Sequence, residues 1–132
     1  MPKDGKPVVL LVDDDDNLRE IIKAKLEAAG FSVAEAKDGE DGLRKTKEIR
    51  PDLVLMDVQM PKMNGIESLS KIKSDPDIAS TKVIFLTNYG EANTADQPLD
   101  DKFAKDIGAA GHIRKTDDLD LIIDRARKEI GL

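Results

Sequence analysis

The chain has 132 residues, of which 39% are hydrophobic and 36% charged, with a formal net charge of −6 and no cysteine. This length fits one domain, and the acidic balance argues against direct nucleic-acid binding, which needs clustered lysine and arginine. The missing cysteine excludes disulfides and thiolate chemistry. The apolar run at residues 8–12 is too short for a membrane span or a signal peptide, so a soluble cytoplasmic protein is expected.

Short apolar runs that predict strands alternate with longer amphipathic stretches that predict helices. The strands are expected at residues 8–12, 31–36, 53–56, 83–86 and 112–114. The helices are expected at residues 17–29, 40–49, 65–73, about 98–107 and 118–130. Continuous apolar runs are typical of parallel strands covered on both faces. This alternation predicts an α/β fold with helices on both faces of a parallel sheet, and it leaves the strand order open.

The first two predicted helices show apolar positions from which their buried faces can be inferred. The first helix is expected to bury one face and to end at Gly30, where a C-terminal cap belongs. That face would hold Leu18, Ile21, Ile22 and Leu26. In the second helix the clearest apolar positions are Leu43 and Ile49, and Pro51 stops the helix.

Polar residues with a joint chemical use follow four of the five apolar runs. Asp13 and Asp14 follow the first run, Asp57 the third, Thr87 the fourth and Lys115 the fifth. Ligands of open α/β sheets bind beyond the carboxyl ends of the strands, so these side chains are expected to converge. Crowded carboxylates repel one another, and Mg²⁺ relieves the repulsion. A metal-bound carboxylate can attack a phosphoryl group, while a lysine and a hydroxyl stabilise its oxygens, so phosphoryl chemistry on an aspartate is expected.

Simpler interpretations compete with this one at several positions. Asp15 and Asp16 are expected only to stabilise a helix N-terminus. A calcium loop counted from Asp13 fails, because its sixth position is Leu18 rather than glycine and its twelfth is Ala24 rather than glutamate.

Three stretches and one strand end carry a resemblance to a known family. The stretches are residues 12–14, residues 55–65 with the pattern Asp-x-x-Met-Pro-x-Met-Asn-Gly, and residues 108–115. Together with the apolar run that ends in Thr87, they resemble, in order, the receiver domains of two-component response regulators. The resemblance covers nearly the whole chain. It implies a single receiver domain over residues 1–132, with a core at about 7–130 and no effector domain in this chain.

The resemblance also implies a flavodoxin-like fold and a metal site. The sheet would be doubly wound, with five parallel strands in the order 2-1-3-4-5. Mg²⁺, with Mn²⁺ as an alternative, would be bound by the side chains of Asp14 and Asp57 and by the backbone carbonyl of Gln59. Asp13 would act through a water molecule.

A phosphorylation switch is the function that the resemblance implies. Asp57 would accept the phosphoryl group from a sensor histidine kinase or a phosphotransfer protein, and Lys115 and Thr87 would contact that group. Thr87 would then move inward and the side chain of His112 would repack, which would switch the face around the fourth and fifth helices. The output partner is not identified by the sequence. The reaction would be self-catalysed with slow dephosphorylation, and the chain would not be a turnover enzyme.

The sequence departs from the usual receiver pattern beyond Thr87. Thr116 stands where the family usually has proline, so a trans peptide bond is expected after Lys115. Asn88 stands where a small residue is common, and the interval between Thr87 and Lys115 is longer than usual. A long loop at residues 88–97 is expected before a fourth helix that starts near residue 98, and this shift favours a monomer or a weak dimer.

Other functional classes remain as alternatives to the receiver. A haloacid-dehalogenase-like phosphatase also uses a strand-end aspartate, but it requires a second aspartate two residues later, where this chain has Gln59. A flavodoxin-like nucleotide binder would need a glycine- or hydroxyl-rich loop after the first strand, where an acidic run stands instead. A pseudo-receiver that only binds partners is disfavoured by the intact acidic residues.

Overall fold

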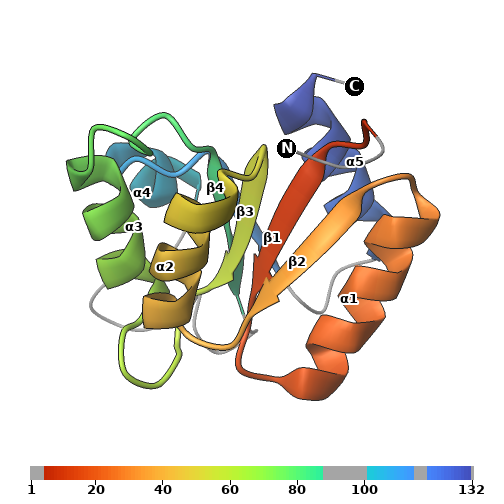
Figure 1. Ribbon diagram of the computed structural model, residues 1–132, viewed down its shortest axis with the longest axis horizontal. Coiled ribbons are helices and arrows are strands. Elements are labelled where there is room, and N and C mark those ends of the chain that lie inside the picture. Colours follow the sequence, from red (N-terminus) through yellow and green to blue (C-terminus); the bar gives the residue numbers. More distant parts are fainter. Residues whose placement is uncertain (1–4, 88–100, 115–118, 132) are drawn as a thin grey trace.

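The computed structural model describes residues 5–87, 101–114 and 119–131, and residues 101–103 are described in their backbone. Strands and helices alternate along the chain (Figure 1). They are β1 (Val8–Val12), α1 (Asp16–Ala28), β2 (Ser32–Ala36), α2 (Gly39–Ile49), β3 (Leu53–Asp57), α3 (Gly65–Ser74), β4 (Val83–Thr87), α4 (Asp101–Asp106), β5 (Gly111–Arg114) and α5 (Leu119–Ile130).

The five strands form one parallel sheet in the order β2-β1-β3-β4-β5. Helices α1 and α5 cover one face of the sheet, and α2, α3 and α4 cover the other (Figure 1). The chain moves outward from β1 to β2 and then returns across β1 to β3, so the strand order reverses between β1 and β3. The predicted doubly wound α/β fold is confirmed, and the reversal point is where such sheets bind ligands.

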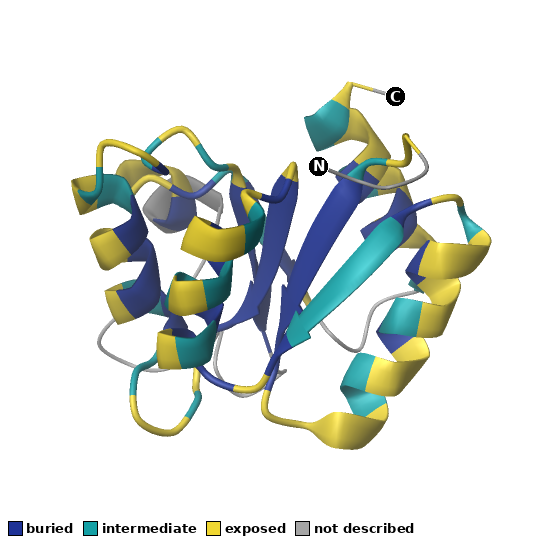
Figure 2. Cartoon of the chain, viewed as in Figure 1, coloured by how far each residue is buried: buried dark blue, intermediate teal, exposed yellow. Residues whose placement is uncertain are grey.

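The strand side chains alternate between two hydrophobic clusters, one on each face of the sheet. Val9 and Leu11 of β1 pack with residues of α1 and α5. Leu10 and Val12 pack with residues of α3 and α4. Every residue of β1, β3 and β4 is buried, whereas β2 is half-buried along most of its length, as expected for an edge strand (Figure 2). Burial on both faces explains why the sequences of the central strands are nearly unbroken apolar runs.

Helix α1 buries a narrower face than the sequence predicts. Ile22 and Leu26 are buried, but the side chain of Ile21 is 52% exposed. Ile21 and Ile22 are adjacent and therefore point about 100° apart around a helix of 3.6 residues per turn, so both cannot face the sheet fully. The prediction that Ile21 lies on the buried face is wrong.

Helix α2 contacts the sheet through buried small residues as well as through Leu43, which packs against the hydrophobic cluster on that face. Leu43 and Ile49 are only half-buried, whereas Gly42 and Thr46 are buried. A Cβ atom at Gly42 would lie 3.0 Å from both methyl carbons of Val12, so the helix backbone runs very close to β1. The small side chains therefore set the distance between α2 and the sheet, which the apolar pattern could not reveal.

Several expectations fall outside the described residues. These are the loop at residues 88–97, the start of the fourth helix near residue 98, and the trans peptide bond between Lys115 and Thr116. The described helix α4 lies within the predicted range of about 98–107. Among the residues that the structure describes, no helix combines the length and the apolar character needed to cross a membrane.

Substitution of adjacent isoleucines tests the burial pattern of α1. Ile22→Ala should lower the free energy of unfolding by about 2–5 kcal/mol, because it leaves a cavity in the core. Ile21→Ala should change it by about 0.5 kcal/mol or less, because this side chain already contacts water. Urea denaturation followed by circular dichroism measures both. Equal losses in the two variants would contradict the assigned burial.

Candidate functional site

Three aspartate side chains meet where the strand order reverses. Asp13 and Asp14 follow β1, and Asp57 is the last residue of the neighbouring strand β3. One carboxylate oxygen of each lies within 4.8 Å of the others. Asp13 and Asp57 are buried, at 0% and 1% exposed, whereas Asp14 is exposed. The convergence of these three residues, predicted from their positions at the strand ends, is confirmed.

The turn after β1 is held by hydrogen bonds to Asp13 and Asp15. The backbone N–H of Asp13 donates to the carbonyl of Ala36 on β2 at 3.1 Å. The N–H of Asp15 donates to Asp13 Oδ1 at 2.9 Å. Asp15 in turn caps α1, because its side chain accepts from the N–H groups of Asn17 and Leu18. The predicted capping role of this part of the acidic run is confirmed, and the cap fixes the direction in which Asp13 leaves the strand.

Arg19 supports the same turn, and the sequence analysis did not identify it. Its guanidinium donates to the carbonyl oxygen of Asp13 at 2.7 Å. It also contacts Asp16 Oδ1 at 2.6 Å and Glu35 Oε1 at 3.1 Å. A planar guanidinium can hold several acceptors at once, so Arg19 ties α1 and β2 to the backbone of the acidic site. Nothing in the sequence distinguishes it from the other charged residues of α1.

The loop after Asp57 folds back so that α3 begins against β3. The N–H of Gly65 donates to the carbonyl of Val58 at 2.7 Å. A Cβ atom at Gly65 would lie 2.3 Å from the carbonyl oxygen of Asp57, so no larger residue fits without moving the backbone. Asn64 caps α3 by accepting from the N–H of Glu67 at 2.9 Å. The loop at residues 58–64 therefore stays close to Asp57, with Gln59 exposed in it.

A second contact holds the far end of this loop against α2. The N–H of Gly39 donates to the carbonyl of Met63 at 3.0 Å, and a Cβ atom at Gly39 would lie 2.2 Å from that oxygen. The buried hydroxyl of Ser68 on α3 donates to the carbonyl of Gly39 at 2.9 Å. Gly39 and Ser68 are thus further supports of the site that sequence reasoning missed. Their role depends on packing between α2 and α3, which no local pattern encodes.

The remaining predicted residues lie on β4 and β5 or beyond them. Thr87 ends β4 next to the strand of Asp57, is fully buried, and its Oγ1 makes no hydrogen bond within the described part of the chain. His112 is half-buried on β5, opposite Phe85 of β4. Lys115 lies outside the described residues. The structure therefore places Thr87 at the same sheet edge as the acidic cluster and His112 further along β5.

The acidic cluster fits a hard divalent cation. Its donors are carboxylate oxygens with no sulfur or imidazole among them, which is the set that Mg²⁺ and Mn²⁺ prefer. Two of the carboxylates are buried, where water cannot screen their repulsion, while exposed Asp14 leaves the cluster open to solvent. Asp13, Asp14 and Asp57 are the residues that would hold such an ion.

Comparison with known families decides what kind of domain this is. Residues 9–127 match the model of the response regulator receiver domain. The chain belongs to this family. It is 32% identical over 124 residues to sporulation initiation phosphotransferase F of Bacillus subtilis, and the alignment covers 94% of both chains. It is also 37% identical over 121 residues to regulatory protein AtoC of Escherichia coli, covering 89% of this chain and 24% of AtoC.

Solved structures agree with the receiver assignment. A chemotaxis response regulator of Vibrio cholerae, CheY4, superposes with a TM-score of 0.80 at 26% identity, over 94% of this chain and 98% of that one. A response regulator receiver domain protein from Clostridium thermocellum gives a TM-score of 0.81 at 28% identity, over 95% and 94% of the two chains. This chain spans only 24%, 48% and 36% of three longer curated relatives, AtoC, RpaA of Synechocystis and CheV3 of Helicobacter pylori.

The support beneath the receiver's acidic turn has a titratable member, Glu35. Burial alone would raise the pKa of Glu35, but hydrogen bonds and charges from Lys23 and Arg19 outweigh it and hold the pKa below its usual value. A depressed pKa in the folded state stabilises the protein above the unfolded-state pKa of glutamate, about 4.3. That contribution is lost as the pH falls through the lower folded-state pKa.

Glu35→Gln should therefore cost stability at neutral pH and little in acid. The difference in unfolding free energy between parent and variant should be constant above about pH 5 and should shrink as the pH falls below about 4. Urea denaturation across this range measures it, with the exposed Glu27→Gln as the control. A difference that grows on acidification would show that Glu35 does not act through these ion pairs.

Proposed function

We propose that this receiver domain accepts a phosphoryl group on Asp57 in a reaction that depends on Mg²⁺. The observation that carries the proposal is the meeting of Asp13, Asp14 and Asp57 within 4.8 Å at the reversal point of the sheet. Bound Mg²⁺ would supply positive charge that offsets the negative charge of the carboxylates and the phosphoryl oxygens.

Asp57 is the acceptor because of its central place in the sheet. Its strand β3 lies between β1, which leads into Asp13, and β4, which ends in Thr87. A phosphoryl group on Asp57 would therefore have carboxylates on one side and the Thr87 hydroxyl on the other. An oxygen of the Asp57 carboxylate forms the new bond to phosphorus while the bond from phosphorus to the donor's imidazole nitrogen breaks. Lys115, which follows β5, is proposed to neutralise a phosphoryl oxygen.

The three acids are proposed to have different roles at the metal. Asp14 is exposed and would bind the ion directly together with Asp57. Asp13 Oδ1 already accepts the N–H of Asp15, so Asp13 would act through a water molecule. The loop at residues 58–64 is held against Asp57 through Gly65, which supports the backbone carbonyl of Gln59 as a further ligand.

The phosphoryl donor is proposed to be a phosphohistidine on a sensor histidine kinase or a phosphotransfer protein. One relative that matches over most of its length is named a sporulation initiation phosphotransferase. Family membership supports a switch that is phosphorylated and slowly dephosphorylated rather than a turnover enzyme. Gln59 lacks the carboxylate that a phosphatase of the haloacid-dehalogenase type would use as general acid and base.

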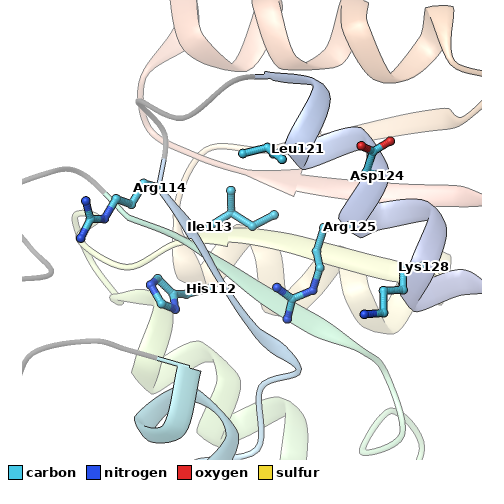
Figure 3. A pocket seen from close by; sticks show the side chains of 7 residues that line it. All are labelled: His112, Ile113, Arg114, Leu121, Asp124, Arg125 and Lys128. Carbon is cyan, nitrogen blue, oxygen red and sulfur yellow. The ribbon is translucent and has the colours of Figure 1, made fainter.

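The response is proposed to pass from Thr87 to β5. Thr87 of β4 pairs in register with Arg114 of β5. Two residues earlier on the same strands, Phe85 pairs with His112. Movement of Thr87 towards the phosphoryl group would shift Arg114 and so bias the packing of His112 on the same strand. The surface of β5 and α5 that includes His112 (Figure 3) would then be read by an output partner.

Incubation with acetyl phosphate and Mg²⁺ tests the acceptor. Intact-mass spectrometry should show one phosphoryl increment on the parent chain, none on Asp57→Asn, and none on the parent when EDTA is present. Asp77→Asn, an exposed carboxylate outside the cluster, should be phosphorylated like the parent. A phosphoryl mass increment that persists in Asp57→Asn would contradict the proposal. Steady hydrolysis of p-nitrophenyl phosphate by the chain would favour the phosphatase instead.

Metal titration separates the roles of the two acids after β1. Asp14→Asn should weaken Mg²⁺ binding more than Asp13→Asn, because a direct ligand is lost rather than one that acts through water. Loss of one charged ligand should raise the dissociation constant by about tenfold or more. Isothermal titration calorimetry measures both variants, with Asp77→Asn, an exposed carboxylate outside the cluster, as the control for loss of one charge. The reverse order for Asp13 and Asp14 would refute the assignment.

A further inference from the structure

An asparagine–glycine pair stands at the junction between the loop at residues 58–64 and helix α3. The chain has four asparagines, and Asn64 is the one that a glycine follows. An asparagine before glycine is chemically labile, because glycine has no Cβ that would hinder attack by its backbone nitrogen on the asparagine side chain. The junction is therefore a candidate for covalent modification.

The reaction of such a pair is a deamidation that consumes water. The nitrogen of Gly65 gives up its proton and forms a bond to Cγ of Asn64. The bond from Cγ to the side-chain nitrogen breaks, and that nitrogen leaves with the proton as ammonia. Water then opens the cyclic imide at one of its two carbonyl carbons. One opening leaves aspartate, and the other leaves isoaspartate, in which the backbone runs through the side chain and is longer by a methylene group.

The folded chain restrains both reacting groups. Gly65 is buried, and its N–H donates to the carbonyl of Val58 at 2.7 Å, so loss of the proton would break a hydrogen bond that is shielded from water. Asn64 Oδ1 accepts from the N–H of Glu67 at 2.9 Å, which holds the carboxamide in the capping position. The ψ angle of Asn64 is 170°, and closure of the imide ring requires rotation away from this extended value. Deamidation therefore requires the start of α3 to open.

The two products of the reaction would differ in their effect on the fold. An aspartate at position 64 keeps the backbone intact and caps a helix as well as asparagine does. Isoaspartate lengthens the backbone directly before Gly65, where a Cβ atom would already lie 2.3 Å from the carbonyl oxygen of Asp57. The added methylene would push α3 away from β3. The glycine that permits this close approach is also what makes the pair labile.

We propose that Asn64 is a site of spontaneous deamidation gated by opening of the junction between the loop and α3, and that the isoaspartate product detaches α3 from Asp57. In a receiver phosphorylated on Asp57 the displaced loop would also impair phosphoryl acceptance, and this consequence rests on the proposed function. The modification itself does not depend on phosphorylation, so failure of one proposal leaves the other standing.

Ser68 holds the junction closed and offers a way to loosen it. Its buried hydroxyl donates to the carbonyl of Gly39 on α2 at 2.9 Å, and its backbone N–H donates to the carbonyl of Asn64 at 3.0 Å. Ser68→Ala removes the first of these bonds. Ser74→Ala is the matched control, because the hydroxyl of Ser74 also donates to a backbone carbonyl, that of Ser70 at 2.8 Å, but at the exposed end of the same helix.

Peptide mapping by mass spectrometry of the chain aged at mildly alkaline pH tests the gating. Deamidation at Asn64 should be about tenfold or more slower in the folded parent than in guanidinium chloride, where the junction is open. Ser68→Ala, checked for a native fold by circular dichroism, should deamidate about fivefold faster than the parent, as expected for loss of one net hydrogen bond. Ser74→Ala should match the parent. Equal rates in the folded and denatured parent, no deamidation at Asn64 in either, or equal rates in the two serine variants would overturn the proposal.

Urea denaturation of the aged chain tests the effect of the product. Ion-exchange chromatography separates the deamidated chains, which carry an additional negative charge, and peptide mapping gives their isoaspartate content. Chains with isoaspartate should unfold at lower urea than Asn64→Asp, which represents the other product and should unfold like the parent. Isoaspartate chains that unfold together with Asn64→Asp would show that α3 stays in place and would refute the detachment.

Discussion

Repulsion among three carboxylates is the constraint around which this receiver domain is built. Two unit charges 4.8 Å apart, the limit that encloses the ligand atoms of Asp13, Asp14 and Asp57, repel by roughly 3 to 4 kcal/mol at an effective dielectric of about 20. Asp13 and Asp57 cannot move away into water, because both are buried at adjacent strand ends. The fold thus gathers carboxylates at a point where a bound cation would relieve their repulsion.

The surrounding structure is arranged to hold the crowded groups in place. Arg19 pins the backbone of Asp13 on one side of the site. On the other side, Gly65 brings α3 against Asp57, and Ser68 with Gly39 holds the far end of the loop. The glycines at these points are required by close approach of backbone atoms, since a Cβ at either would overlap a carbonyl oxygen. A rigid scaffold of this kind would keep the proposed ligand positions fixed while a metal ion and a phosphoryl group bind and leave.

The sequence predicted the fold and the convergence of the acids because those features follow from local patterns. An unbroken apolar run such as β1 requires burial on both faces, and the residue after such a strand falls at the ligand-binding edge. The sequence did not predict that Ile21 would be exposed or that α2 would pack through Gly42, since both depend on how a helix sits on its neighbours.

The most direct test of the central claim is the stability of Asp57→Asn against the parent, measured by urea denaturation with EDTA and then with saturating Mg²⁺. If the carboxylates repel one another, the variant should be more stable than the parent without a cation, because one of the crowded charges is gone. Mg²⁺ should then stabilise the parent, by about 2.7 kcal/mol at a concentration a hundredfold above the dissociation constant, and the variant much less. A variant that is less stable than the parent in EDTA and gains as much from Mg²⁺ would contradict the account.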